Sequence, residues 1–167
     1  MTLEGRVFKF GDNINTDYII SGRYKFSITD MRELAKHIFE DIRPEFASQV
    51  SPGNTIIVAG KNFGCGSSRE QAPLAIKEAG IPVIIAESFA RIFYRNAFNV
   101  GLVLIEVDTS SIEEQDYLKI DLEKSQIVNI TKSKSLEFKA LEPLMRKLLQ
   151  EAGVVNLIRR YKGWPQI

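Results

Sequence analysis

The sequence predicts an α/β domain whose central strands run parallel. Three apolar segments, residues 55–59, 82–86 and 102–107, are rich in Val, Ile and Leu. Short apolar runs of this kind are typical of strands that are covered on both faces. Two segments with helical character, residues 68–79 and 89–99, separate the three strands. Strands that alternate with helices in this way indicate a sheet that is at least partly parallel.

The N-terminal part of the chain predicts a strand, a loop and a helix in that order. Residues 7–10 read as a short strand. Residues 11–17 follow as a loop, because its Asp, Asn and Thr side chains can bond their own backbone. After an irregular piece, Thr29 or Asp30 can cap a helix that runs to about Asp41.

The helices of the α/β unit carry recognisable end signals. Gly80 is expected to close the helix over residues 68–79. Ser88 is expected to cap the helix over residues 89–99, which Gly101 then stops.

The pattern changes after residue 108. Three short segments, residues 117–122, 126–131 and 136–139, predict antiparallel strands. A helix is expected over residues 141–152, and residues 156–162 are expected to add a last helical turn.

Length and composition fit one domain that spans residues 1–167. A net charge of +1 argues against nucleic-acid or membrane partners, because both need a sustained basic field. The apolar segments are far too short to span a bilayer. The first ten residues include Glu4, Arg6 and Lys9 and lack the apolar region of a signal peptide, so a cytoplasmic location is expected.

The chain has one cysteine, Cys65, and one histidine, His37. A single cysteine cannot form an internal disulfide, which fits a reducing compartment. Metal and iron–sulfur sites need about three or four Cys or His ligands, so this chain is expected to bind no cofactor by itself. Cys65 is expected to be a small packed thiol rather than a nucleophile, and His37 to lie at the surface.

The segment from Lys61 to Glu70 (KNFGCGSSRE) concentrates the chemistry of the sequence, and it allows three interpretations. The first is structural. Ser67 and Glu70 have the S-x-x-E spacing of a capping box, in which two side chains satisfy free N–H groups at a helix start. Such a cap stabilises a helix by about 1 kcal/mol and needs no function.

The second interpretation is a nucleotide site. Gly64 and Gly66 follow a strand and open a helix, and Glu87 ends the next strand about 20 residues on, as in a dinucleotide fingerprint. However, the third glycine position holds Arg69, which would block close packing of the helix on the strand. No Gly-Lys-Ser/Thr is present, so the phosphate-binding Walker A pattern is absent as well.

The third interpretation is a carboxylate site. Glycines let the backbone approach a ligand closely, and a helix N-terminus offers free N–H donors. Ser67 and Ser68 add hydroxyls, and Arg69 adds a planar guanidinium that matches a carboxylate with two hydrogen bonds. A small hydroxy-di- or tricarboxylate is the natural ligand for such a loop.

Three motifs in order, GCGSSRE at 64–70, NINTD at 13–17 and ESFARIFYRN at 87–96, give the chain a specific resemblance. Together they closely resemble the small subunits of the isopropylmalate dehydratase and homoaconitase family, which are similar to the swivelling C-terminal domain of aconitase. The resemblance covers residues 3–105 and, more loosely, the rest of the chain. It implies a single swivelling β/β/α domain.

The resemblance also implies a mechanism in which a large partner subunit holds a [4Fe–4S] cluster that binds the substrate hydroxyl. Ser67 matches the base that takes a proton from carbon, Ser68 and Arg69 match residues that hold a substrate carboxylate, and Asp17 matches a polar residue near the site. A helix N-terminus contributes at most about 2 kcal/mol, too little to make a serine basic at neutral pH. The chain is therefore expected to be half of an active site, completed in a heterodimer or heterotetramer, with homo-oligomers possible when it is isolated.

The loop with Tyr24, Lys25 and Phe26 matches a family loop that reaches over the substrate and reads its variable group. Homoaconitase-like members are expected to have arginine where this chain has Phe26, so the resemblance favours isopropylmalate, a substrate of leucine biosynthesis. Two alternatives stay open: a homoaconitase small subunit, and a non-catalytic carboxylate- or nucleotide-binding module. Phe26 can equally pack as a core or hinge residue.

Overall fold

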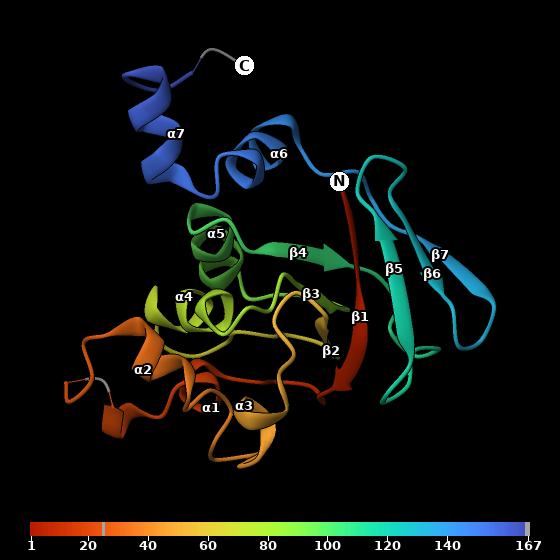
Figure 1. Ribbon diagram of the computed structural model, residues 1–167, viewed down its shortest axis with the longest axis horizontal. Helices are drawn as coiled ribbons and strands as arrows, with labels where there is room; N and C mark the ends of the chain where they lie inside the picture. Colours follow the sequence, from red (N-terminus) through yellow and green to blue (C-terminus); the bar gives the residue numbers. More distant parts are fainter. Residues whose placement is uncertain (25, 166–167) are drawn as a thin grey trace.

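The computed structural model describes residues 1–24 and 26–165 and is built on one seven-stranded sheet. The strand order is β4-β3-β2-β1-β5-β6-β7. The strands are β1 (Thr2–Lys9), β2 (Thr55–Ala59), β3 (Val83–Ala86), β4 (Val103–Glu106), β5 (Tyr117–Asp121), β6 (Gln126–Asn129) and β7 (Lys134–Glu137). Strand β1 joins the two halves of the sheet, because it pairs parallel with β2 and antiparallel with β5 (Figure 1).

The parallel half confirms the strands predicted from apolar runs. Every residue of β2 and β3 is buried, and β4 is buried except at Glu106. Strand β4 is shorter than the predicted range 102–107, because only Val103–Glu106 pairs with β3.

Strand β1 begins earlier than the predicted range 7–10. Its first residues, Thr2 to Arg6, pair with β5, and most of their side chains stay partly or fully exposed. This stretch lacks an apolar run because one side of it faces solvent.

The antiparallel half also confirms the prediction, with one shift. The third strand covers Lys134–Glu137 rather than residues 136–139, because Gln126 pairs with Glu137 and Asn129 with Lys134. Strands β5, β6 and β7 lie on one side of β1, and helices α1 to α5 lie on the other (Figure 1).

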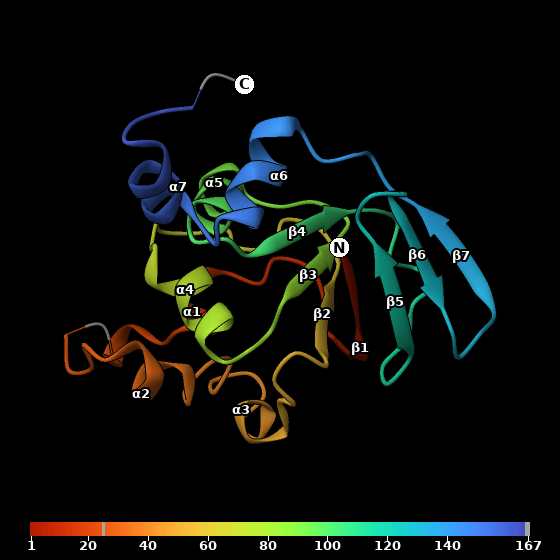
Figure 2. The same cartoon turned by 45° about the horizontal axis from the view of Figure 1, so that its top comes forward.

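Seven α-helices and one short 3₁₀ helix are present in the described residues. They are α1 (Thr16–Ile19), η1 (Gly22–Tyr24), α2 (Met31–Ala35), α3 (Phe46–Gln49), α4 (Gln71–Glu78), α5 (Arg91–Asn99), α6 (Pro143–Gln150) and α7 (Val154–Tyr161). Helices α6 and α7 pack on α5, which in turn packs on β4 and α4 (Figure 2). None of the helices in residues 1–24 and 26–165 is long and apolar enough to cross a membrane.

The helix predicted to run to Asp41 is much shorter. Asp30 caps it as expected, accepting a hydrogen bond of 2.8 Å from the Arg32 backbone N–H. The helix ends at Ala35, and Phe39 adopts a positive φ of 58°. The backbone N–H of Phe39 donates to the Ile19 carbonyl at 2.9 Å, so a contact with a distant segment replaces the next helical turn.

Helices α1, α3 and α7 also differ from the sequence prediction. Helix α1 lies in a region expected to be loop, and Asn15 caps it by accepting a hydrogen bond of 2.9 Å from the Tyr18 N–H. Helix α3 was also not predicted. Helix α7 has eight residues where one turn was expected, because Leu157 is fully buried and anchors it.

Candidate active site

The candidate site lies where β1, β2 and β3 end. Ligands of open α/β sheets bind at the carboxyl ends of parallel strands, because loops from neighbouring strands meet there. Here the three loops are joined by isolated β-bridges, between Asn15 and Cys65 and between Phe63 and Phe89. The GCGSSRE motif therefore sits between the other two motifs that the sequence singled out.

Glycine is required at Gly64 for two reasons. Its φ is +80°, and a Cβ added there would lie 2.2 Å from the Cγ of Phe93. Gly66 has φ +91° but no clash, since the nearest atom to an added Cβ would be the Asn15 Cβ at 3.5 Å, an ordinary contact. Gly64 thus lets the loop pass closely against Phe93 of α5.

Thr16 fixes the backbone of the loop. Its side chain is nearly fully buried, and its hydroxyl donates to the Ser67 carbonyl at 2.9 Å. Its backbone N–H donates to the Cys65 carbonyl at 2.9 Å. The sequence prediction missed Thr16 as a site residue, although it is part of the NINTD motif.

The capping-box interpretation of Ser67 and Glu70 is wrong. Helix α4 begins at Gln71, and Glu70 occupies its N-cap without a side-chain hydrogen bond. Ser67 lies before the first helical turn, where the effect of the helix dipole has largely fallen off. Residues 68–70, predicted as helix, instead continue the loop past the cleft.

The predicted cap at Ser88 is also wrong. Helix α5 begins at Arg91 after Ala90, because Phe89 and Ala90 still pair with Phe63. The Ser88 hydroxyl accepts a hydrogen bond of 2.8 Å from the Asn62 backbone N–H instead. Ser88 therefore ties two site loops together.

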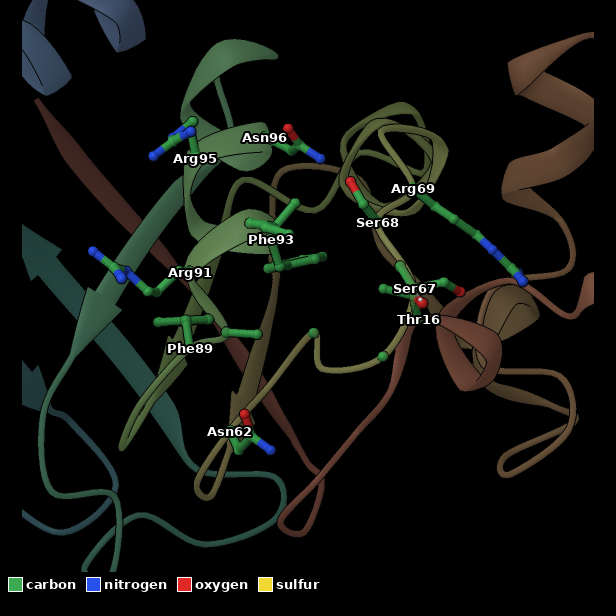
Figure 3. A pocket seen from close by; sticks show the side chains of 14 residues that line it. Thr16, Asn62, Ser67, Ser68, Arg69, Phe89, Arg91, Phe93, Arg95 and Asn96 are labelled. Atoms are coloured by element: carbon green, nitrogen blue, oxygen red, sulfur yellow. Dashed lines mark hydrogen bonds between the residues drawn. The ribbon is translucent and has the colours of Figure 1, made fainter.

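A cleft of about 690 Å³ opens between the GCGSSRE loop and the start of α5. Figure 3 shows Ser67, Ser68 and Arg69 on one side and Arg91 and Arg95 on α5 on the other. The residues that line it are Thr16, Asn62, Gly64, Gly66, Ser67, Ser68, Arg69, Phe89, Ala90, Arg91, Ile92, Phe93, Arg95 and Asn96.

The two serines of the motif present their hydroxyls to the cleft. Ser67 and Ser68 are both exposed, and neither hydroxyl forms a hydrogen bond with residues 1–24 or 26–165. Both groups are therefore available to a ligand.

Arg69 is held rigidly and keeps a spare donor. Its Nη2 lies 2.6 Å from Asp17 Oδ1, and its Nη1 donates to the Ile20 carbonyl at 3.3 Å. The Arg69 side chain is 14% exposed, and its buried Nε has no partner among the described residues. An unsatisfied buried donor is costly, which favours an added acceptor such as a carboxylate oxygen.

The structure thus brings together the four residues predicted for catalysis and carboxylate binding, Ser67, Ser68, Arg69 and Asp17. Asp17 contacts the site through Arg69, and its own side chain is largely exposed.

The aconitase C-terminal domain family matches residues 12–110 of the chain. This match covers all three motifs and more than half of the sequence. The chain belongs to this family.

Relatives within the aconitase C-terminal domain family match nearly the whole chain. A 3-isopropylmalate dehydratase small subunit of Archaeoglobus fulgidus is 51% identical over 96% of this chain and 97% of its own length. A homoaconitase small subunit of Methanothermobacter thermautotrophicus is 53% identical over 92% of this chain and 89% of its own length. The crystal structure of a 3-isopropylmalate dehydratase from Methanocaldococcus jannaschii superimposes with a TM-score of 0.93 at 48% identity, covering 97% of this chain and 96% of that one.

The loop that corresponds to the predicted specificity loop of the family includes the end of η1, whose first residue, Gly22, lies near Arg69. Tyr24 ends η1 and packs against the core, whereas Phe26 is 88% exposed. The interpretation of Phe26 as a core residue is therefore wrong. Lys25 lies outside the described residues.

Metal ligands are not grouped in the part of the chain that the structure describes. No cluster of three or more His, Cys, Asp or Glu side chains there could hold a metal ion. Cys65 is half-buried, and its carbonyl accepts a hydrogen bond from the backbone N–H of Thr16. The described residues therefore offer no set of ligands for an iron–sulfur cluster.

Proposed function

We propose that this chain is the small subunit of 3-isopropylmalate dehydratase, a hydro-lyase of leucine biosynthesis. The enzyme would interconvert 2-isopropylmalate and 3-isopropylmalate by dehydration and rehydration. One observation carries the proposal. Two unbonded serine hydroxyls and an arginine with a spare buried Nε line one cleft. The names of relatives that match nearly the whole chain support it.

In this proposal each residue of the motif has a separate task. Ser67, once its hydroxyl is deprotonated in the assembled site, accepts the proton that leaves carbon and returns to the hydroxyl form; its side chain lies exposed in the cleft, and its carbonyl is fixed by Thr16. Ser68 and Arg69 hold a substrate carboxylate, since the Ser68 hydroxyl is unbonded and Asp17 and Ile20 use only part of the N–H donors of the Arg69 guanidinium. Asp17 keeps Arg69 oriented through their contact of 2.6 Å.

The chain supplies only half of the active site in this proposal. A serine hydroxyl is a weak base, and the helix that follows starts at Gln71, too late to assist Ser67 strongly. The rest would come from a large subunit that carries a [4Fe–4S] cluster. The open shape of the cleft leaves space for such a partner, because a cleft of about 690 Å³ is larger than a small hydroxy acid needs.

Helix α5 would face that partner. Arg91, Ile92 and Arg95 are exposed on the wall opposite the serines. Neither arginine forms an ion pair with a carboxylate of the described residues, unlike Arg23, Arg43, Arg69 and Arg160, which do. Two unpaired guanidinium groups beside an apolar side chain fit an acidic surface with an apolar centre.

The choice of isopropylmalate follows from the loop at Phe26. An apolar side chain there suits an isopropyl group, whereas burying an extra carboxylate without a cation would cost several kcal/mol. Arg23 does not supply this cation, because it pairs with Asp41 at 2.8 Å. The homoaconitase small subunit remains the second candidate, since one relative of that name is 53% identical.

The substrate is tested with the chain assembled on its large subunit. We expect a higher kcat/KM for isopropylmalate than for a homocitrate-type tricarboxylate, and a reversal or clear narrowing of that ratio in Phe26→Arg. Equal or better use of the tricarboxylate by the unmodified protein would instead support a homoaconitase, in which a cation at another position binds the extra carboxylate.

A further inference from the structure

Glu40 gathers three side chains around one carboxylate oxygen. Its Oε2 accepts a hydrogen bond of 2.7 Å from the Tyr24 hydroxyl and lies 2.9 Å from the Nδ1 of His37. The same oxygen lies 3.6 Å from Nη2 of Arg23, which also binds Asp41. The network therefore joins η1 to the segment that follows α2.

Tyr24 connects this network to the turn that carries Phe26. Its carbonyl accepts hydrogen bonds from the backbone N–H groups of Ser27 at 3.3 Å and Ile28 at 3.2 Å. Its ring stacks on His37 with the ring centres 4.2 Å apart. One residue thus closes the turn with its backbone and docks it with its side chain.

The docked turn adjoins the carboxylate site. A Cβ added at Gly22, the first residue of η1, would lie 3.9 Å from Arg69 Nη2 and 3.9 Å from Asp17 Oδ1. The backbone contact from Phe39 to Ile19 holds the other side of the same segment. A shift of the Glu40 segment would therefore move the turn relative to Arg69.

The charge of Glu40 strengthens the docking. The hydrogen bond from the Tyr24 hydroxyl lowers the pKa of Glu40, and His37 and Arg23 lower it further against the opposing effect of burial. The carboxylate is ionised at neutral pH, and hydrogen bonds to an ionised acceptor are stronger than neutral ones.

We propose that Glu40 and His37 are positioning residues for substrate selection. Through Tyr24 they fix η1, the element that leads to Phe26 and whose first residue, Gly22, adjoins Arg69. Neither residue touches the substrate. The proposal rests on the proposed function, because it takes Phe26 to read the variable group of the acid.

Hydrogen exchange on the isolated chain tests the docking directly. In Glu40→Gln the amides of Ser27 and Ile28 are expected to exchange about tenfold faster, the effect of losing a charged hydrogen-bond acceptor. Glu33→Gln is the matched control, since Glu33 pairs with Lys36 on α2 and has no contact with η1. Core amides in β2 and β3 should not change in either variant. Unchanged exchange at Ser27 and Ile28 in Glu40→Gln would overturn the proposal.

The substrate selectivity of the assembled enzyme tests whether the Glu40 network affects the choice of substrate. Glu40→Gln should lower the kcat/KM ratio of isopropylmalate over a homocitrate-type acid several-fold, mainly through KM, while Glu33→Gln keeps it. Tyr24→Phe, which retains the ring against His37 but lacks the hydroxyl, should give a smaller loss. If Glu40→Gln speeds amide exchange at Ser27 and Ile28 but leaves the kcat/KM ratio of the two acids unchanged, the network is merely structural and the positioning role is overturned.

The two measurements also separate this proposal from the function on which it rests. If the unmodified protein, assembled on its large subunit, does not turn over isopropylmalate, the proposed function fails. The exchange comparison then decides by itself whether Glu40 docks the turn.

Discussion

The role proposed for Ser67 depends on the surroundings of this weakly reactive residue. Its carbonyl is held by the buried Thr16 hydroxyl, and the preceding residue, Gly66, adopts a left-handed φ of 91°. The hydroxyl itself is unbonded and exposed. Its role therefore depends on position rather than on a hydrogen-bonded base within the described residues.

Ser67→Ala separates chemistry from folding. Because Ser67 caps no helix, its replacement should leave the free energy of unfolding almost unchanged. The kcat of the assembled enzyme should fall at least about a hundredfold, the usual loss for a general base. Urea unfolding and steady-state kinetics check both points. Ser68→Ala should mainly raise KM, and a Ser67→Ala enzyme with most of its kcat would assign the proton transfer to another group.

The sequence indicated the residues that we propose as the site, but not the residues that hold them in place. Ser67, Ser68 and Arg69 are neighbours in one motif, so their residue types alone indicated carboxylate chemistry. Thr16 acts on a residue 51 positions away, and Glu40 acts on one 16 positions away. Such contacts arise only when the chain folds, which is why neither role was visible in a local pattern.

At the scale of elements, the GCGSSRE loop is shaped by two glycines with different constraints. An alanine at either position must adopt a positive φ, which costs about 1–2 kcal/mol. At Gly64 the new Cβ would also collide with Phe93 Cγ at 2.2 Å.

Gly64→Ala should therefore destabilise the protein by several kcal/mol in total, since overpacking adds about 1–3 kcal/mol. Gly66→Ala is the matched variant, and it should lose only about 1–2 kcal/mol because its surroundings are open. Chemical denaturation measures the difference. Equal losses in the two variants would show that Phe93 does not constrain the loop.

The exposed face of α5 provides a second test at this scale. If Arg91 and Arg95 face an acidic surface of the large subunit, Arg91→Glu with Arg95→Glu should weaken assembly at least about tenfold, because like charges would then meet. Titration of one subunit into the other measures this affinity. The control is Lys119→Glu with Lys134→Glu, on exposed strand positions of β5 and β7. It makes the same change in charge and should leave the affinity between the subunits unchanged. Normal assembly with a raised KM would assign the arginines to the substrate instead.

Strands were easier to predict than helix ends, and the reason is physical. The runs in β2 and β3 are apolar throughout, so burial on both faces can be read locally. Helices α2 and α5 begin or end where distant backbone groups compete for their hydrogen bonds. Phe39 bonds to Ile19, and Phe89 pairs with Phe63, so the predicted ends at Asp41 and Ser88 were displaced.

At the scale of the whole molecule, Asp116 connects the two halves of the sheet. Its backbone pairs with Val7 of β1, and its buried carboxylate accepts hydrogen bonds from Asn129 at 2.7 Å and from the Glu113 N–H at 2.9 Å. Burial acts to raise the pKa of Asp116, but these bonds and the nearby Lys132 outweigh it and lower the pKa.

This carboxylate should make stability depend on pH in the acid range. A folded pKa below the unfolded one contributes stability above the unfolded pKa, about 4, and loses it as the pH falls through the folded pKa. Asp116→Asn should therefore lower the free energy of unfolding at pH 7. It should also make that free energy fall less steeply as the pH is lowered. Urea unfolding between neutral and acidic pH tests this, and a decline as steep as that of the unmodified protein would show that other carboxylates dominate.

Assembly decides the central claim, that this chain is one half of a hydro-lyase active site. The purified chain is mixed with a reconstituted cluster-bearing large subunit, and conversion of 3-isopropylmalate is followed for each component and for the mixture. We expect the chain alone to be colourless, free of iron and inactive, and turnover to appear only in the mixture. Turnover by this chain alone, with iron absent by metal analysis, would contradict the half-site model.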